Sequence, residues 1–252
     1  MKKPLLVLVV GATGSVGRLV VEEALKADHV VRALVRSSGK INWPDGVKEC
    51  QGDLARPATI VPAVTGIDAV VFAHGTYGSI EAAREVDYGG VRNVLFALDS
   101  RQARVALMTA IGVTDRKGAH DWKRRAERLV RTSGMPCTIV RPGWFDYNDR
   151  DQLRPVLLQG DRRQSGTPRD GVVSRRLIAR ILVASLTSQA AVRKTFELVA
   201  EYGQEPEGFD ALFDLTDADT VGAMDAVHDL ENMPPDREPA EVLEELRMLS
   251  AV

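Results

Sequence analysis

The sequence predicts an α/β fold, built as a doubly wound parallel sheet with a small C-terminal substrate-side lobe and an acidic helical tail. Short apolar runs alternate with helix-like runs through about the first 200 of the 252 residues. Strand, helix, strand at this spacing is typical of right-handed βαβ units, whose strands lie parallel in one sheet. A glycine-rich turn at residues 11–17 joins the first strand-like run to the first helix-like run.

Each expected element rests on a local pattern. A continuous apolar run indicates a buried strand at 5–10. Further strand-like runs lie at 30–36, 47–54, 68–74, 104–110, 136–142 and 194–200. Helical periodicity separates them at 18–27, from Pro57, and at 80–98, 119–133 and 174–186. Residues 143–173 are polar and predict loops with short elements. In the tail, helices are expected at 209–215 and 240–249, and Pro234 and Pro235 separate them.

The ends of the chain and its cysteines narrow the class of protein. The N-terminal apolar run follows two lysines as in a signal peptide, but it ends in a glycine turn rather than a cleavage site, so a strand is predicted. No run approaches the roughly 18 apolar residues that cross a bilayer, so we expect no membrane partner. Cys50 and Cys137 are too few for a disulfide framework, and nothing resembles a metal site. These features predict a cytoplasmic protein without a metal.

The charge is divided unevenly along the chain. The net charge is −2, but residues 201–252 contain 15 acids against Arg237 and Arg247, a net of −13. Residues 1–200 therefore carry +11. A basic body suits a nucleic acid or an anionic ligand. The alternative is that the acidic tail is the intramolecular partner of the basic body. We expect residues 205–252 to fold back on the body or onto a second subunit, in a possible homodimer.

A basic cluster between Lys123 and Arg131 raises the question of nucleic-acid binding. Its helical spacing predicts that most of the charges lie on a solvated face. The cluster has no interleaved aromatic residues, and no helix-turn-helix or RNA-binding signature accompanies it. We therefore expect no nucleic-acid partner.

The glycine-rich turn is the most informative motif. Its first glycine, Gly11, permits a tight turn, Gly14 lets the backbone approach a pyrophosphate, and Gly17 allows close packing of helix against strand. The helix N-terminus then offers free N–H groups to phosphates. The turn residues expected at the cofactor also include Thr13, Ser15 and Val16. With a strand before it and a helix after it, the motif predicts a Rossmann-type nucleotide-binding unit.

The end of the second strand indicates which dinucleotide binds. A carboxylate about 20 residues after the glycines normally accepts a hydrogen bond from the ribose 2′-hydroxyl of NAD. Here that strand ends in Arg36, Ser37 and Ser38, without an acid. Arg36 suits a 2′-phosphate, Ser37 adds a hydroxyl, and Arg18 lies just past the third glycine. The alternative is a solvated arginine at a strand end. The sequence favours NADP(H) over NAD(H).

These motifs together resemble a known superfamily. The segments GATGSVGR, VRALVR, Gly52-Asp53-Leu54, VDYGGVRNV (86–94) and 122–143 occur in the order found in atypical or extended short-chain dehydrogenases/reductases, in their NAD(P)H-binding, NmrA-like and flavin-reductase-like branch. The resemblance covers residues 4–200. It implies a single domain over 1–252, with 1–142 as the main cofactor-binding part and 143–252 as the substrate-side lobe and tail.

The same resemblance assigns further cofactor contacts. It implies that Asp53 and Leu54 flank the adenine. The stretch after the fourth strand, Ala73-His74-Gly75, would lie along the cofactor. Pro142 and Gly143 would border the nicotinamide.

The resemblance also locates the catalytic positions. In the superfamily a tyrosine donates a proton and a lysine four residues later holds the nicotinamide ribose. Lys123 matches the lysine, but the tyrosine position is Ala119, and the usual serine falls at Thr109 or Ala110. His120 lies on nearly the same helical face and is a candidate substitute donor, although a surface histidine at a helix start is the competing interpretation. Thr109 is either a substrate contact or a strand-end hydroxyl.

Two interpretations of function follow. The first is hydride transfer from NADPH to a small, conjugated organic substrate, with Lys123 on the ribose and Thr109 or His120 polarising or protonating the acceptor. Tyr77 and Tyr147 are further candidates that reach the site from loops. The second is a non-catalytic, NADP(H)-responsive binding protein, which the absence of the tyrosine keeps open.

Overall fold

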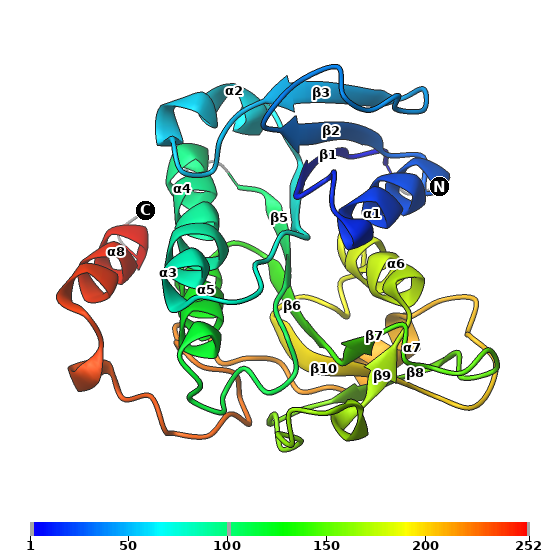
Figure 1. The fold of residues 1–252 in the computed structure, drawn as a ribbon, viewed down its shortest axis with the longest axis vertical. Helices are drawn as coiled ribbons and strands as arrows, with labels where there is room; N and C mark the ends of the chain where they lie inside the picture. Colours follow the sequence, from blue (N-terminus) through cyan, green and yellow to red (C-terminus); the bar gives the residue numbers. More distant parts are fainter. Residues whose placement is uncertain (1–2, 100–101, 251–252) are drawn as a thin grey trace.

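One central sheet organises the molecule. The computed structural model describes residues 3–99 and 102–250. Its eight strands lie in the order β3-β2-β1-β4-β5-β6-β10-β8 (Figure 1). Their bounds are β1 Leu6–Val10, β2 Val30–Val35, β3 Val47–Gln51, β4 Ala69–Phe72, β5 Arg104–Met108, β6 Cys137–Pro142, β8 Arg154–Leu158 and β10 Lys194–Glu201. All neighbours run parallel except β8, which is antiparallel to β10, so the predicted doubly wound α/β fold is confirmed.

Helices cover both faces of this sheet. On one face lie α1 (Ser15–Lys26) and α6 (Arg175–Ser185), which share a core with the inner residues of the strands. On the other lie α2 (Val61–Val64), α4 (Gly89–Leu98) and α5 (Ala119–Thr132), with α8 (Ala240–Ser250) packed outside them (Figure 1). In the described part of the chain, no helix is long and apolar enough to cross a membrane.

The helix expected at 80–98 is interrupted by a wider turn. It comprises α3 (Ile80–Ala82), a π-helical turn (Ala83–Tyr88) and α4. The hydroxyl of Ser79 caps its start by accepting a hydrogen bond from the Ala82 N–H at 3.1 Å. A π-helical turn often marks a functional site, because it turns side chains and carbonyls away from their helical directions.

The lobe after β6 contains more regular structure than its polar sequence predicted. Within 143–173, β8 extends the main sheet, and β7 (Trp144–Phe145) pairs with β9 (Val172–Val173). The 3-10 turns η1 (Pro57–Thr59), η3 (Pro168–Asp170) and η4 (Pro235–Arg237) and the short helix α7 (Asp210–Asp214) complete the elements. The strand β8 was not predicted because its apolar run, Val156 to Leu158, is only three residues long and follows a proline.

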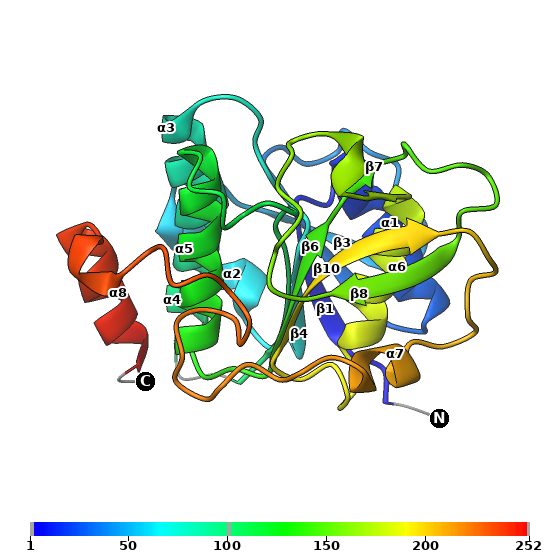
Figure 2. The ribbon, with the colours of Figure 1, turned by 90° about the horizontal axis from the view of Figure 1, so that it is seen from below.

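The acidic tail packs on the body of the same chain. We call residues 217–250 the C-terminal strap. In Figure 2 it runs from the region of α7 past α5 and ends in α8. Within α8, Val242, Leu246 and Leu249 are buried in the core shared with α4 and α5. The expectation that the tail folds back is thus met within one chain.

The strap corrects the prediction made for the basic cluster of α5. The prediction that these charges lie on a solvated face is wrong. The side chains of Arg124 and Arg128 are 0% exposed and that of Arg131 is 3% exposed. Strap carboxylates cover them through ion pairs: Arg124–Asp225 at 3.0 Å, Arg125–Glu238, Arg128–Asp225 and Arg128–Glu238 at 2.6 Å, and Arg131–Asp219 at 2.9 Å. Because each buried arginine is paired with a carboxylate, none of them is an isolated charge in the interior.

Arg141 of β6 links this cluster to the sheet. Its guanidinium pairs with Glu127 and Asp229 at 2.7 Å and with Glu197 at 3.3 Å, and all four side chains are buried. Burial alone would raise the pKa of Asp229, but the hydrogen bonds and charge of Arg141 lower it to about 2. Burial raises the pKa of Glu197 to about 7, because it outweighs the opposing charge of Arg141.

Glu197 gives the free energy of unfolding a pH dependence. Its pKa is about 7 in the fold against 4.5 for the ordinary group, so the folded state binds the extra proton between these values. The stabilisation is present below pH 4.5 and disappears as the pH rises through 7, a change of about 3 kcal/mol. Urea unfolding of wild type and Glu197→Gln at pH 5 and pH 8 measures it. The wild type should lose more stability than the variant between these pH values, and equal losses would contradict the prediction.

Candidate functional site

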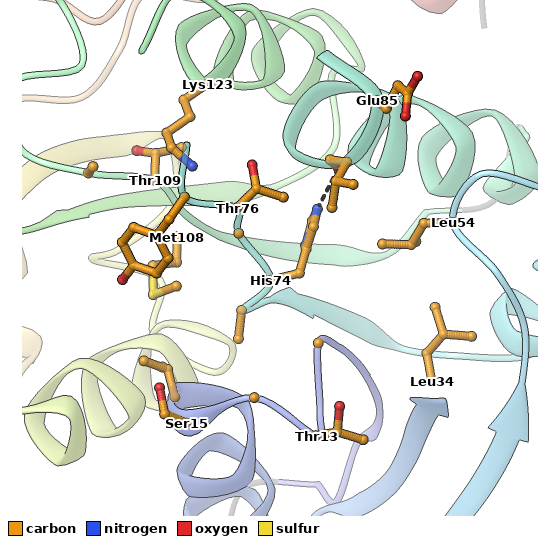
Figure 3. Close-up of a pocket in the computed structure, with 18 of the residues that line it drawn as sticks. Thr13, Ser15, Leu34, Leu54, His74, Thr76, Glu85, Met108, Thr109 and Lys123 are labelled. Carbon is orange, nitrogen blue, oxygen red and sulfur yellow. Dashed lines mark hydrogen bonds between the residues drawn. The ribbon is translucent and has the colours of Figure 1, made fainter. Parts of the chain in front are cut away.

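A cavity of about 740 Å³ opens at the carboxyl ends of the parallel strands. It lies where the strand order reverses between β1 and β4, the usual position of a ligand in an open α/β sheet. Figure 3 shows Thr109 and Lys123 at one end, Leu34 and Leu54 at the other, and His74 between them. Most predicted residues line it: Gly11, Thr13, Gly14, Ser15, Val16, Arg36, Asp53, Leu54, Ala73, His74, Gly75, Thr109, His120 and Lys123.

The glycine turn forms the floor below the start of α1. Gly11 has φ +81°, and the Gly14 N–H donates to its carbonyl at 2.9 Å. Gly17 lies behind the cavity wall, because a Cβ there would stand 2.0 Å from the Gly11 oxygen. The turn therefore uses Gly17 for packing, and it leaves the N–H groups at the start of α1 directed at the cavity.

A second cavity, of about 910 Å³, adjoins the first at the end of β2. The two share Thr13, Arg36, Gly52 and Asp53 in their walls. The second adds the predicted Arg18 and Ser37, and also Lys40 and Arg56, which were not predicted from the sequence. Arg18 Nε donates to the Thr13 carbonyl at 3.1 Å, and Arg56 pairs with Asp53 at 3.1 Å. The basic side chains make this cavity suitable for an anionic group.

Lys123 is held by an aspartate from the π-helical turn. Its Nζ lies 2.6 Å from Oδ2 of Asp87, and both side chains are largely buried. Asp87 also accepts hydrogen bonds from the backbone N–H of Thr76 at 2.9 Å and its hydroxyl at 3.1 Å. Asp87 belongs to the VDYGGVRNV segment, but no role was predicted for it, since an acid on a helix is usually solvated.

His74 carries a hydrogen-bond acceptor that the protein leaves unpaired. Its Nε2 contacts the Val86 carbonyl at 3.0 Å, which requires a hydrogen on Nε2. Burial lowers the pKa of the imidazole, against the pull of Asp87, which favours the neutral ring with an acceptor at Nδ1. Among the described residues, nothing donates to this buried Nδ1. An acceptor of this kind suits a hydroxyl or amine of a ligand.

The Thr109 hydroxyl points its hydrogen away from the cavity. It donates to Oε1 of the fully buried Glu127 at 2.7 Å, and Arg141 holds that carboxylate from the far side. Thr109 therefore presents only lone pairs to the cavity. Polarising a substrate oxygen requires a donor, so Thr109 in this position does not fit that expected role.

The remaining candidates differ in their access to the cavity. Ala119, at the expected tyrosine position, and His120 line the wall beside Lys123. Tyr77 also lines it, but its residue is 90% exposed. Tyr147 is exposed and packs edge-on against Trp144 with ring centroids 5.8 Å apart. Pro142 lies behind the wall, where its carbonyl accepts the Ile111 N–H at 3.0 Å.

Comparison with known proteins assigns the family. A family model described as NAD(P)H-binding matches residues 11–189. The chain belongs to this NAD(P)H-binding family. The UPF0659 protein YMR090W of Saccharomyces cerevisiae is 32% identical over 223 aligned positions, and the match covers 81% of this chain and 96% of the yeast protein. Sanguinarine reductase of Eschscholzia californica is 26% identical over 255 residues, covering 82% of this chain and 91% of the reductase.

One further relative and two solved structures also resemble this chain. The photosystem II assembly factor Ycf39 of Synechocystis is 28% identical over 204 residues, 77% of this chain and 62% of the factor. Among solved structures, the oxidoreductase ylbE of Lactococcus lactis has a TM-score of 0.68 at 15% identity, covering 83% of this chain and 95% of the other. A Veillonella parvula short-chain dehydrogenase/reductase in complex with NADP has a TM-score of 0.60 at 18% identity. The match covers 81% of this chain and 100% of the Veillonella chain. These structures show the Rossmann fold.

The residues of this NAD(P)H-binding chain fit a dinucleotide. The glycine turn leaves an open cradle at Gly14, where a Cβ would occupy the space over the turn. His74 Nδ1 offers an unpaired acceptor along the cavity, and Lys123 offers donors at its far end. The basic second cavity adjoins the first at the end of β2, where Arg36 belongs to both walls.

Proposed function

We propose that the protein is an NADP(H)-dependent oxidoreductase that transfers a hydride to a small, conjugated organic acceptor in the cytoplasm. The observation that carries this proposal is the single cavity that joins the glycine turn to Lys123 and His120 and adjoins the basic second cavity. Sanguinarine reductase among the relatives, and the NADP complex among the structural neighbours, support it.

Each end of the cavity has its own task. The cofactor supplies the hydride at its nicotinamide. Lys123, aimed by Asp87, would bind the nicotinamide ribose at that end. The walls there include Met108, Ala119 and Phe145, whose apolar surfaces suit a flat, conjugated acceptor and exclude water.

Arg36 should decide the preference for NADP(H). We expect Arg36→Glu to weaken NADPH binding about 10- to 100-fold and to leave NADH binding nearly unchanged, because a charge-assisted hydrogen bond to phosphate contributes about 1.5–3 kcal/mol. Titrations of cofactor fluorescence and thermal shifts with each cofactor measure this. Lys48→Glu is the matched control, since Lys48 is an exposed residue of β3 outside both cavity walls. Equal thermal shifts of the wild type with NADPH and NADH would overturn the proposed preference.

The absence of the usual tyrosine proton donor favours a second function, that of a non-catalytic NADP(H)-binding protein. The tyrosine position holds Ala119, and Thr109 turns its hydrogen toward Glu127. One relative is a photosystem II assembly factor rather than a reductase by name. A protein that binds NADP(H) and signals its redox state to a partner would need the cofactor site without a proton donor.

Turnover separates the two functions. The purified protein is mixed with NADPH and a panel of flavins, quinones and aldehydes, and absorbance at the reduced-nicotinamide band is followed. Steady oxidation that depends on Lys123 supports the oxidoreductase. Tight NADPH binding without turnover of any acceptor supports the binding protein.

A further inference from the structure

His120 lies next to the position where the superfamily's proton donor is missing. Ala119 and His120 begin α5, and Lys123 follows one turn later, so all three line the same end of the cavity. The imidazole is 30% exposed, which gives it contact with both the cavity and water. These facts place a titratable side chain beside the expected nicotinamide end.

The imidazole is fixed by a single nitrogen. His120 Nδ1 lies 2.9 Å from the Gly112 carbonyl and 2.9 Å from Oδ1 of Asp115. A carbonyl oxygen only accepts, so Nδ1 must carry a hydrogen. In the neutral ring Nε2 then has a lone pair, and in the described part of the chain no residue bonds to it. A proton taken up or released by His120 is therefore exchanged at Nε2.

The two acceptors of Nδ1 belong to a rigid loop. Asp161, which is fully buried, accepts the backbone N–H of Gly112 at 2.6 Å and that of Thr114 at 2.7 Å. The Asp115 N–H donates to the Gly112 carbonyl at 3.1 Å, and Lys117 pairs with the second oxygen of Asp115 at 2.9 Å. This loop holds the ring in one orientation.

We propose that His120 is the proton donor of the reaction and that Asp115 is its positioning residue. This rests on the proposed oxidoreductase. The hydride adds to the acceptor's electrophilic atom with its electron pair. The imidazolium form of His120 gives up its Nε2 proton to the oxygen or nitrogen that gains negative charge, and the neutral Nδ1–H ring remains. NADPH is oxidised, the acceptor gains two electrons and two hydrogens, and His120 recovers a proton from water.

Other groups in the wall are less suited to this step. Lys123 directs its ammonium to Asp87, and Thr109 directs its hydrogen to Glu127. The Tyr77 phenol belongs to a residue that is almost wholly exposed. Among these side chains of the cavity wall, His120 combines a fixed ring with a nitrogen to which no described residue bonds.

Nitrogen-15 NMR of the protein without acceptor tests the geometry. His120 should show the Nδ1–H tautomer, whereas the other three of the four histidines should show Nε2–H. His29 accepts a hydrogen bond at Nδ1, and His74 and His228 donate through Nε2. Asp115→Ala should move His120 toward the Nε2–H form that a free histidine side chain prefers. An Nε2–H tautomer in the wild type would overturn the proposal.

Two acceptors with different proton requirements test the chemistry. Phenanthrenequinone needs a proton with the hydride, whereas the N-methylacridinium cation becomes neutral by hydride addition alone. His120→Gln should lower kcat for the quinone about 100-fold and leave that for acridinium unchanged. Asp115→Ala should show a smaller loss with the same selectivity, and His228→Gln, a surface histidine also paired with an aspartate, should change neither.

The outcomes separate the inference from the function on which it rests. Equal losses with both acceptors, or no loss with the quinone, would overturn the proton-donor role. A wild type that binds NADPH but reduces neither acceptor would overturn the oxidoreductase itself, and with it any proton transfer by His120, even with the Nδ1–H tautomer in place.

Discussion

A chain that ends after Thr216 is expected to lose its cooperative fold. The truncation removes the C-terminal strap and with it Val242, Leu246 and Leu249, which are at most 5% exposed. Burying each such side chain contributes about 1.5–3 kcal/mol, so their loss alone costs about 5 kcal/mol or more. Total stability is typically about 5–15 kcal/mol. Near-UV circular dichroism, thermal unfolding and size-exclusion chromatography should show a molten or aggregating species.

The electrostatic contribution of the strap to the free energy of unfolding can be measured separately from its apolar contribution. In Glu238→Gln, Arg125 and Arg128 lose a buried charged partner while the strap stays in place. Breaking a buried ion pair from one side typically costs about 3–5 kcal/mol. Glu244→Gln is the control, because Glu244 is exposed and its pair with Arg247 at 3.6 Å contributes little.

Two results would contradict this role of the strap. A truncated protein with the wild-type melting temperature would make residues 217–252 an independent acidic appendage. A Glu238→Gln variant as stable as Glu244→Gln would mean that the arginines of α5 do not depend on the strap.

The parts of the fold that were predictable are those set by local sequence. The apolar run before Gly11 and the helical pattern after Gly17 lie within a few residues of each other, and periodicity resolves both. The same holds for β4, β6 and α6. In the candidate site, the glycine turn was predicted from its short motif and Lys123 from the resemblance to the superfamily, and both line the cavity.

The features that were missed depend on contacts far apart in the sequence. Arg128 lies 110 residues from Glu238, so its helical pattern indicated a solvated face although the strap buries it. Asp87 reaches Lys123 only because a π-helical turn redirects it, and 36 residues separate the two. The pairing of Asp115 with His120 is local, at five residues, but it depends on a loop held by the distant Asp161. Spacing does not report such partners.

Substitutions in the glycine turn give the second large expected effect. Replacing Gly17 should lower stability, whereas replacing Gly14 should weaken cofactor binding. In Gly17→Ala the new Cβ would stand 2.0 Å from the Gly11 oxygen and 2.7 Å from its carbonyl carbon. Both are backbone atoms of the turn, so no side chain can move aside. Overpacking typically costs about 1–3 kcal/mol, and more where backbone must shift. We expect a loss of about 3 kcal/mol or more in urea unfolding.

Gly14→Ala is the matched variant, because it adds the same methyl group three residues earlier. Its Cβ would lie 3.2 Å from the Gly11 oxygen, and its backbone is already in an extended conformation that alanine adopts. Stability should fall by about 1 kcal/mol or less, while NADPH binding weakens at least about tenfold, since the methyl occupies the approach to the turn. Wild-type stability of Gly17→Ala would disprove the close approach of helix and strand. Wild-type NADPH affinity of Gly14→Ala would place the pyrophosphate elsewhere, because a phosphate on the start of α1 cannot share that space with a Cβ.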